Sequence, residues 1–466
     1  MDRVGILLVS KCLSSSAMVD TFLRSQKYRP EFYVIERQLN PFNHSRAKFH
    51  AVVPTLALGE IVKIARRFRD SIAFGLTDTE DFVVAGGRDA VEKEAGVPMV
   101  CVTKKYAVER SKADQRLLFD AIFKEANPDY RVFDPRDYPD SDSAMREFRK
   151  TAAGMDAVVV KPDAPARGAG VGVWGSDFES EEEMSSFFLN VLSKGRVVVE
   201  RKVEGEESSF HAFSDGKHFH PAPLTRDYKR ALDENRGRLT GGMGSYRSKG
   251  AGLPFLTYGE SERLSEAEED AFRRWRGRGS EPGLRGIVLY DAIMHTGRGF
   301  KVLERNSRGG NTEVVNLLAT LADDLVDVCY RTVEGSLKQL RFRSESSVVT
   351  CAVPNSYGGA GDGDGGSKVD LAAAYALAER QGGRLRILPM DLREEDGMTK
   401  MGTSRTVAVA ALAGSLAEAR EISLRGVEAI SGPLRWRKDI ASAADLARSA
   451  AHMRLLRRSS RLPASA

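Results

Sequence analysis

The chain has 466 residues, of which 42% are hydrophobic and 29% are charged, a composition typical of a globular protein with three or four packed domains. Its formal net charge of +5 is small for this length and gives little support to nucleic-acid binding. Cys12, Cys101, Cys329 and Cys351 lack CxxC spacing, and the apolar run 4–9 is too short for a signal peptide or a membrane span. We therefore expect a cytoplasmic protein that binds neither nucleic acid nor membrane.

Short apolar runs alternate with amphipathic stretches in the first hundred residues. The runs at 4–9, 32–36, 71–76 and 98–103 are predicted strands, with helices near 17–25, 59–69 and 80–95. This alternation indicates a parallel sheet in an α/β domain. The turn after the first strand, 10–16, contains no glycine, which disfavours a dinucleotide, although a helix N-terminus rich in hydroxyls could still hold a phosphate.

A strand–glycine loop–strand hairpin is predicted next. The strand 156–160 is followed by Lys161 and then by Gly168, Gly170 and Gly172, with a new helix beginning at Ser180. Glycines let backbone amides approach a phosphate closely. A plain hairpin turn is the alternative interpretation.

The middle of the chain carries a strand at 196–200 and a hairpin that turns at Asp215 and Gly216. His218 and His220 alternate on one strand of this hairpin, but no third ligand is evident, so we interpret them as ordinary surface histidines. A basic run, 227–230, leads into the glycine-rich stretch LTGGMGSY at 239–246.

A further hairpin joins the strand 286–294 to the strand 300–306, and the second strand ends in Glu304 and Asn306. Residues i and i+2 of a strand point to one face, so the carboxylate and the amide oxygen can hold one Mg²⁺ between them. The alternative is that both residues form the polar face of an edge strand. A helix is predicted over 313–334.

Beyond Phe342 the pattern predicts a small α+β domain, with strands at 347–353, 384–390 and 404–412 and helices near 370–380 and 415–430. The last residues are rich in Ala, Ser and Arg, and we expect a solvated or frayed terminus there, with a basic helix as the alternative. The predicted domains are an N-terminal substrate-side α/β domain, a central domain with a lid, a C-terminal domain and a basic tail: 1–105, 106–345 with the lid at roughly 156–225, 346–438 and 439–466.

No nucleophilic Ser, Cys or His elbow is present in the sequence. The central region instead offers a lysine at a strand end, backbone donors, a basic run and an oxygen pair for a metal. These parts suit a site that phosphorylates a carboxylate by positioning and charge neutralisation.

The order of these motifs closely resembles the ATP-grasp ligases, and within them the phosphoribosylamine–glycine ligase (glycinamide ribonucleotide synthetase) family. The likeness rests on VVVERKVEGEESSF, DYKR with TGGMGSY, GIVLYDAIM, VLERNSR and the C-terminal MGTSRTVAVAALAG, and it covers most of residues 70–440. It implies an α/β fold with an N-terminal parallel-sheet (pre-ATP-grasp) domain, an ATP-grasp domain with a β-rich lid and a small α+β C-terminal domain.

The resemblance also implies the activity. In that family ATP phosphorylates the carboxylate of glycine, and 5-phosphoribosylamine attacks the acyl phosphate to give glycinamide ribonucleotide, ADP and phosphate in purine biosynthesis. We therefore expect an enzyme, a carbon–nitrogen ligase that is a monomer or homodimer. Its cofactors would be ATP and Mg²⁺ or Mn²⁺.

Site residues carried over from the family fall into three groups. The metal ligands would be Glu304 and Asn306, with Asp291 as a third candidate, for which a paired surface carboxylate is the alternative. The residues facing the phosphates and the acceptor would be Lys229, Arg230 and Arg308. The nucleotide would contact Lys161, Arg167, Gly168, Gly170, Glu200, Arg201, Val203, Glu207, Gly241 and Gly242, with Glu200 and the backbone of 201–203 at adenine and Glu207 at the ribose.

Three departures from the family pattern leave the substrates open. The glycine loop after the first strand is missing, Ala169 stands where the family has a lysine, and the family motif RFGDPE reads RGGNTE at 308–313. Arg167 could replace the missing lysine, although a guanidinium is not equivalent to an ammonium. The alternatives are an ATP-grasp ligase for another amino acid or amine, and a catalytically impaired nucleotide-binding paralogue.

Overall fold

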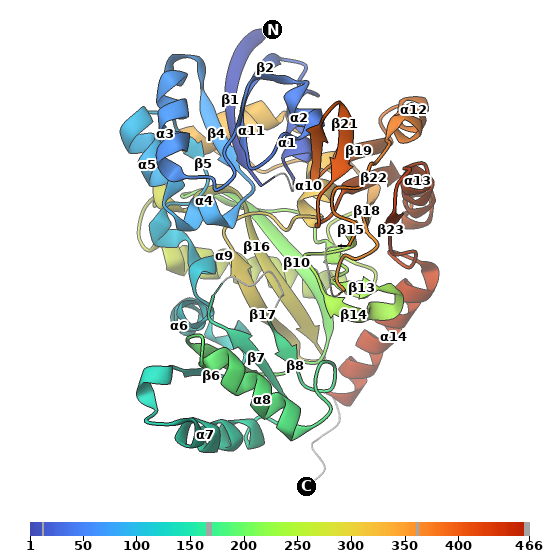
Figure 1. Ribbon diagram of the computed structural model, residues 1–466. Coiled ribbons are helices and arrows are strands. Elements are labelled where there is room, and N and C mark those ends of the chain that lie inside the picture. Colours follow the sequence, from blue (N-terminus) through green and yellow to red (C-terminus); the bar gives the residue numbers. More distant parts are fainter. Residues whose placement is uncertain (12–13, 165–169, 360–362, 461–466) are drawn as a thin grey trace.

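The computed structural model describes residues 1–11, 14–164, 170–359 and 363–460. The N-terminal domain is a parallel sheet in the order β3-β2-β1-β4-β5, as the alternating pattern predicts (Figure 1). Strand β3, at the edge, was not expected from the sequence. The strands are β1 (Asp2–Ser10), β2 (Tyr28–Glu36), β3 (Ala47–Val52), β4 (Phe74–Thr77) and β5 (Met99–Val100), and the helices are α1 (Ser15–Phe22), α2 (Pro41–His44), α3 (Leu58–Arg67), α4 (Glu80–Val84) and α5 (Gly87–Ala95).

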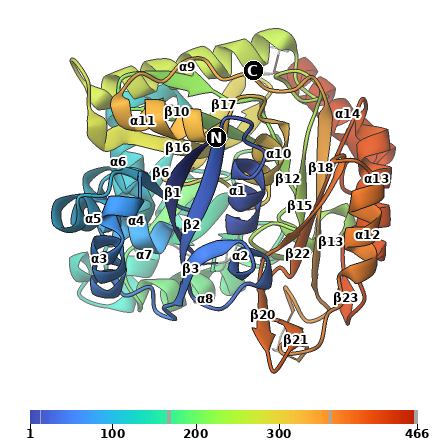
Figure 2. The ribbon, with the colours of Figure 1, turned by 90° about the horizontal axis from the view of Figure 1, so that it is seen from above.

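Alternation of side chains along β1 explains the layers of this domain. Leu7 and Val9 pack with residues of α3 and α5 on one face, whereas Ile6 and Leu8 pack with α1 and with α11 (Leu325–Glu334) on the other. Figure 2 shows α3 and α5 on one side of β1 and β2, and α1 on the other. The carboxyl ends of β1 and β4 lie side by side, because the two strands are parallel neighbours.

The central sheet is antiparallel, in the order β11-β10-β16-β17. Both predicted hairpins, β10–β11 and β16–β17, are present. Helix α9 packs against this sheet, and α6 packs against both α9 and β17. The elements are β10 (Glu206–Asp215), β11 (Phe219–Pro221), β16 (Arg285–Thr296), β17 (Gly299–Asn306), α6 (Lys112–Ile122) and α9 (Tyr258–Arg276).

A separate small unit lies below the central sheet in Figure 1 and consists of a four-stranded sheet and two helices. Its own aromatic core includes Phe148 and Phe188, whose rings stack 4.2 Å apart. The elements are β6 (Tyr130–Phe133), α7 (Ser141–Ala153), β7 (Val158–Pro162), β8 (Gly172–Val173), α8 (Glu181–Leu192) and β9 (Val197–Arg201). This unit begins at β6, earlier than the lid expected from residue 156.

The C-terminal sheet crosses the expected domain boundary at 345/346. Strand β15, from the central part of the chain, pairs with β18, and the order is β12-β15-β18-β22-β19 with β23 beside β18. Helices α12 and α13 pack against this sheet. The elements are β12 (Arg226–Asp227), β15 (Gly244–Arg247), β18 (Ser346–Pro354), α12 (Ala372–Arg380), β19 (Leu385–Pro389), β22 (Val407–Ala413), α13 (Leu416–Glu428) and β23 (Leu434–Arg435), with two hairpins, β13 (Arg230–Leu232) with β14 (Arg236–Leu239) and β20 (Leu392–Glu395) with β21 (Met398–Met401).

Two helix predictions were wrong. The expected helix 313–334 is two helices, α10 (Glu313–Thr320) and α11, because the chain turns between them and Asp324 caps the second. The tail, for which a solvated or frayed end was expected and a basic helix was the alternative, forms the helix α14 (Ala443–Ser459), in which Met453 is fully buried. Asp445 accepts a hydrogen bond from the Tyr228 hydroxyl, so α14 contacts the DYKR segment directly.

Candidate active site

One face of the central sheet carries two of the three predicted metal ligands. The strand register places His211 opposite Tyr290 and Tyr290 opposite Asn306, while Glu304 lies opposite Ala292. Directly opposite residues share a face, and so do residues i and i+2. Glu304 and Asn306 therefore project from the same face as Tyr290 and His211.

The charges around Glu304 suit a site that binds a metal ion together with an anion such as a polyphosphate. Burial opposes ionisation of its carboxyl, but Lys112, Lys229, Lys161 and Arg308 hold the Glu304 pKa below its usual value. Asn306 is 2% exposed, and its Nδ2 is a buried donor without a hydrogen-bond partner among the described residues. An ionised carboxylate and an amide oxygen fit Mg²⁺ or Mn²⁺, and the surrounding cations fit a polyphosphate.

Asp291 does not lie with this pair. It is opposite Arg305 on the other face of the sheet, and Arg305 Nε donates to both carboxylate oxygens, at 2.9 and 3.0 Å. Arg305 also bonds Glu268 of α9 at 2.7 Å. Asp291 is thus ion-paired, as in the alternative to metal binding, but it is 2% exposed and does not lie at the surface.

Lys161 and Glu200 meet, but in a buried ion-pair network. Lys161 Nζ donates to Glu200 Oε2 at 2.7 Å, and Arg116 Nε donates to Oε1 at 2.8 Å. Burial lowers the Lys161 pKa, although Glu200 opposes this shift. Both oxygens of Glu200 are engaged, so its carboxylate positions these two cations.

The residues after Glu200 lead from the small unit to the central sheet. Arg201 ends β9 and bonds Asp129 and Asp156 at 2.9 and 2.7 Å, and Val203 lies in the link to β10. Glu207, near the start of β10, is paired with Lys229. Burial opposes protonation of Lys229, but Glu207 and Tyr290 raise its pKa well above the usual value.

Arg230 connects the central region to the small unit. Its Nη1 donates to Asp177 Oδ1 at 3.0 Å, in the segment between β8 and α8. Gly170 has φ +78°, a left-handed conformation that favours glycine. Arg167 and Gly168 lie outside the described residues.

The TGGMG segment packs closely on the acidic residues of the site. A Cβ on Gly242 would lie 2.8 Å from Asp227 Oδ1, and its φ of +104° also requires glycine. Gly241 is exposed, and its carbonyl accepts from Arg405. Both predicted glycines thus border the site that contains Lys229.

Four residues at this site had no predicted role. Thr312 Oγ1 lies 2.9 Å from Glu313 Oε2 and 3.2 Å from Asp227 Oδ1, and Ser209 donates to Glu313 Oε1 at 2.9 Å. Burial and the nearby Glu313 raise the Asp227 pKa to about 8. The sequence signals for them were the RGGNTE, DYKR and VEGEESSF segments that contain them.

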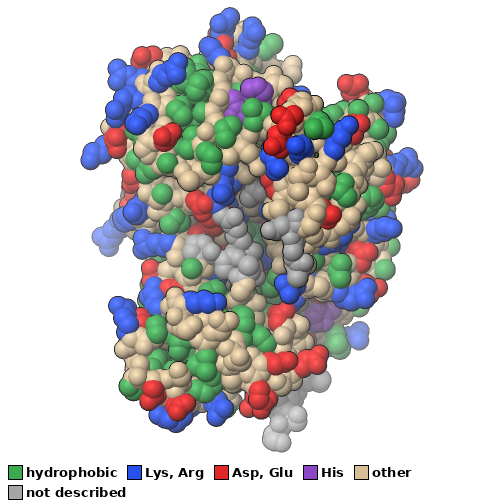
Figure 3. All heavy atoms as spheres, in the orientation of Figure 1, with side chains coloured by type: hydrophobic (Ala, Val, Ile, Leu, Met, Phe, Trp, Pro, Cys, Tyr) green, Lys and Arg blue, Asp and Glu red, His purple; other side chains and the backbone are tan. Residues whose placement is uncertain are grey.

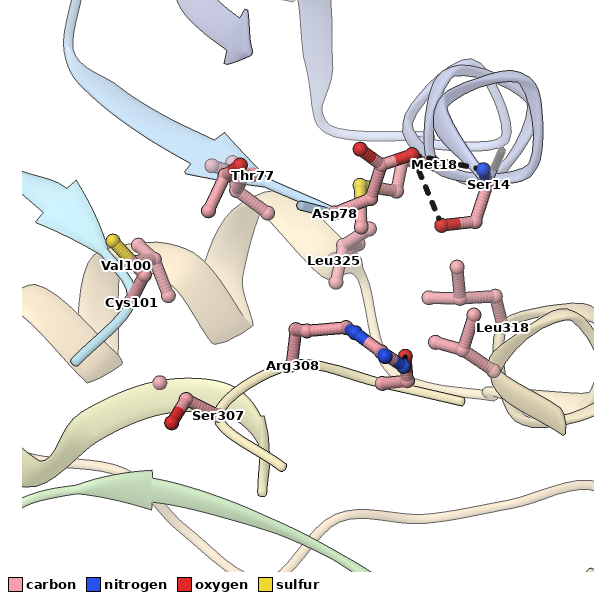
Figure 4. A pocket seen from close by; sticks show the side chains of 14 residues that line it. Ser14, Met18, Thr77, Asp78, Val100, Cys101, Ser307, Arg308, Leu318 and Leu325 are labelled. Carbon is pink, nitrogen blue, oxygen red and sulfur yellow. Dashed lines mark hydrogen bonds between the residues drawn. The ribbon is translucent and has the colours of Figure 1, made fainter. Parts of the chain in front are cut away.

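Arg308 lies where the N-terminal domain meets the central sheet. Its guanidinium is 3.4 Å from Glu80 and 3.3 Å from Glu109, and burial raises the Glu109 pKa to about 7 against the effect of Arg308. Figure 4 shows Arg308 across a pocket from Asp78 and Ser14. Figure 3 shows the molecule hollowed between the small unit and the domains above it.

Comparison with known proteins identifies the family. Residues 120–314 match the model of the phosphoribosylglycinamide synthetase ATP-grasp (A) domain. The chain is 31% identical to the phosphoribosylamine–glycine ligase of Pyrococcus horikoshii over 412 residues, which are 88% of this chain and 89% of the relative. The chain belongs to the phosphoribosylamine–glycine ligase family.

Two further matches extend over nearly the whole chain. The phosphoribosylamine–glycine ligase of Methanocella arvoryzae is 31% identical over 463 residues, covering 97% of this chain and 99% of the relative. The crystal structure of the phosphoribosylamine–glycine ligase of Thermotoga maritima has a TM-score of 0.71 at 21% identity and covers 94% of this chain and 100% of that chain. The expected family and fold class are confirmed.

As a member of this family the protein is an ATP-dependent carboxylate–amine ligase that acts on small molecules. Among the described residues no helix is long and apolar enough to cross a membrane. In the described ranges no group of three or more His, Cys, Asp or Glu is arranged to hold a metal ion.

Proposed function

We propose that this member of the family joins glycine to 5-phosphoribosylamine through a glycyl phosphate, with Mg-ATP, to give glycinamide ribonucleotide, ADP and phosphate in de novo purine biosynthesis. The observation that carries the proposal is the Glu304–Asn306 pair on one sheet face, surrounded by Lys112, Lys161, Lys229 and Arg308. In this proposal the enzyme is cytoplasmic and is a monomer or homodimer.

The chemistry needs few reactive side chains. A carboxylate oxygen of glycine attacks the γ-phosphorus of ATP, the bond to the ADP oxygen breaks, and an acyl phosphate forms. The acceptor amine then attacks the acyl carbon, the bond to phosphate breaks, and the amine loses a proton. Mg²⁺ or Mn²⁺ on Glu304 and Asn306 would supply charge neutralisation on the phosphates.

The cations have separate positions in this scheme. Lys161 reaches the site from the small unit and is held by Glu200, whereas Lys229 lies beside the central sheet and is held by Glu207. Binding of ATP would bring the ribose hydroxyls to Glu207 and the phosphates to Lys229. Both residues of this ion pair would then contact the nucleotide. Gly170, Gly241, Gly242, Arg201 and Val203 would contribute backbone contacts.

The test is ADP release by the purified full chain with Mg-ATP and glycine, with and without 5-phosphoribosylamine generated in situ. We expect ADP release to require both substrates and to stop in Glu304→Gln. The same assay with other amino acids and amines covers the alternative of a ligase with different substrates. ATP binding without ADP release for any pair would instead identify a binding protein and refute the proposal.

A further inference from the structure

Thr312 is one of the departures from the family motif at 308–313, and it occupies a buried position of the site. The motif has proline there, which carries no side-chain hydroxyl, whereas the side chain of Thr312 has one and is completely buried. Thr312 immediately precedes α10, but its hydroxyl does not cap that helix. The hydroxyl faces two carboxyl groups instead.

The Thr312 hydroxyl bridges Asp227 and Glu313. Its oxygen lies 2.9 Å from Glu313 Oε2 and 3.2 Å from Asp227 Oδ1. A hydroxyl has one proton to donate and lone pairs that accept. It can therefore donate to one ionised carboxylate while it accepts from the other carboxyl group, provided that this second group carries a proton. The geometry suits two acids that hold one proton between them.

The charges around the two acids place this proton on Asp227. Burial and the nearby Glu313 raise the Asp227 pKa to about 8. Burial opposes ionisation of Glu313 as well, but His211 and hydrogen bonds, including the one from Thr312, hold the Glu313 pKa below its usual value. At neutral pH protonated Asp227 thus donates to Thr312, and Thr312 donates to ionised Glu313. Among the described residues, the other ionisable side chains that face the pair are Glu207, His211, Lys229, Tyr290, Cys351 and Arg405.

Asp227 is the member of this pair that a substrate can reach. Thr312 and Glu313 are buried, whereas Asp227 is only partly buried. It lies two residues before Lys229 and beside Gly242, on which a Cβ would be 2.8 Å from Asp227 Oδ1. A carboxylate whose pKa is raised toward the working pH is a far better general base than an ordinary aspartate. Asp227 therefore has both the position and the basicity to take a proton from an amine.

We propose that Asp227 accepts the proton that the acceptor amine loses, and that the Thr312 hydroxyl makes Asp227 the stronger base by bridging it to Glu313. As the amine nitrogen bonds to the acyl carbon and the bond to phosphate breaks, an N–H bond breaks and an O–H bond forms on Asp227. The proton passes to water when the product leaves. Thr312 does not touch the substrate and is a positioning residue. This inference rests on the proposed function in requiring an amine acceptor.

Thr312→Val tests the bridge, because it removes the hydroxyl and keeps the shape of the side chain. Protonated Asp227 then loses its acceptor, so the pH at which Asp227 becomes a free base should fall by about one unit. The assay is ADP release with Mg-ATP, glycine and limiting 5-phosphoribosylamine. Each variant rate is divided by the wild-type rate at the same pH, which cancels the supply and the titration of the amine. This ratio should fall about tenfold between about pH 6 and about pH 9, while the wild-type rate itself rises up to about pH 8.

Matched variants separate this effect from a loss of packing. Thr312→Ser restores the hydroxyl and should follow the wild type at every pH. The control Thr332→Val removes another buried hydroxyl, which donates to the Val328 carbonyl within α11, and its ratio should not vary with pH. Asp227→Asn should lower kcat at least about 100-fold. A Thr312→Val ratio that stays constant or rises with pH, a serine variant that behaves like the valine variant, or an active Asp227→Asn would each overturn the inference.

Infrared titration examines the pair without turnover. The difference spectrum between wild type and Asp227→Asn isolates the protonated Asp227 carboxyl from Glu109 and Glu268, whose pKa values are also raised. Its band should disappear near pH 8 in the wild type and about one unit lower in Thr312→Val, or in Thr312→Ala if the valine variant does not fold. Equal midpoints would refute the role of Thr312. Absence of ADP release by the wild type would refute the proposed function, and the infrared midpoints would still decide whether Thr312 controls the proton on Asp227.

Discussion

Replacement of Glu200 by Gln tests whether the buried network of Arg116, Glu200 and Lys161 supports the fold as well as the site. Glu200 and Arg116 are each 2% exposed, and Lys161 is 8% exposed. The Gln side chain keeps the shape of Glu but supplies no charge, so two buried cations are left beside each other without a carboxylate. Removal of one member of a buried pair costs about 3–5 kcal/mol.

Lys161 can relieve part of this cost by losing its proton. Burial already lowers its pKa, and the variant also lacks the Glu200 charge that opposes this shift. A lysine with a folded-state pKa below its unfolded value of about 10.4 penalises the folded state most at low pH, and the penalty shrinks as pH rises toward that value. The destabilisation should therefore be largest near neutral pH and smaller at high pH.

Urea unfolding of the wild type and Glu200→Gln, followed by circular dichroism at several pH values, measures the effect. The control is Glu204→Gln, since Glu204 is 78% exposed and its loss should change stability by less than about 0.5 kcal/mol. Equal urea midpoints for Glu200→Gln and the control, or a destabilisation that grows with pH, would refute the reasoning.

Three further outcomes are expected. Glu304→Gln should abolish ADP release while altering stability by less than about 1 kcal/mol, because glutamine keeps the shape of the side chain and opens no cavity; retained turnover would contradict the metal role. The pKa of Asp227, raised to about 8, lies above its unfolded value of about 3.9, so wild-type stability should fall as pH rises through this window. Asp227→Asn should lose less stability over the same range, and parallel urea midpoints for the two proteins would count against that pKa. Removal of residues 443–466 eliminates hydrogen bonds to Arg226, Tyr228 and Glu206, each worth about 1 kcal/mol, and should lower both the melting temperature and kcat; full activity in the shortened protein would exclude this support.

The sequence predicted those features that depend on residues close together in the chain. The β16–β17 hairpin and the shared face of Glu304 and Asn306 follow from strand alternation, and both are present. The position of Asp291 depends on the hairpin register, which contains an irregularity at Ala292. A single-residue difference in register decides whether Asp291 lies opposite Glu304 or opposite Arg305.

Contacts between segments far apart in the chain could not be predicted from local sequence patterns. Glu200 and Arg116 are 84 positions apart, and the sequence around neither residue indicates that the two side chains form an ion pair. Asp78 reaches Ser14 from another strand end, 64 positions away. The helix α14 was only the alternative prediction for the tail, since its buried side chains include Asp445 and Ser449, which give little apolar signal.

The pairing of β15 with β18 has a practical consequence for anyone who wishes to divide this enzyme. A shortened protein that stops near residue 345 would keep β15 but lose the strand that satisfies one side of its backbone. The unpaired amides and carbonyls of Gly244–Arg247 would form an exposed strand edge next to the TGGMG turn, and another chain could pair with it. Expression of the catalytic half alone should therefore yield aggregates, and a fluorescent or affinity fusion belongs at an end of the intact chain.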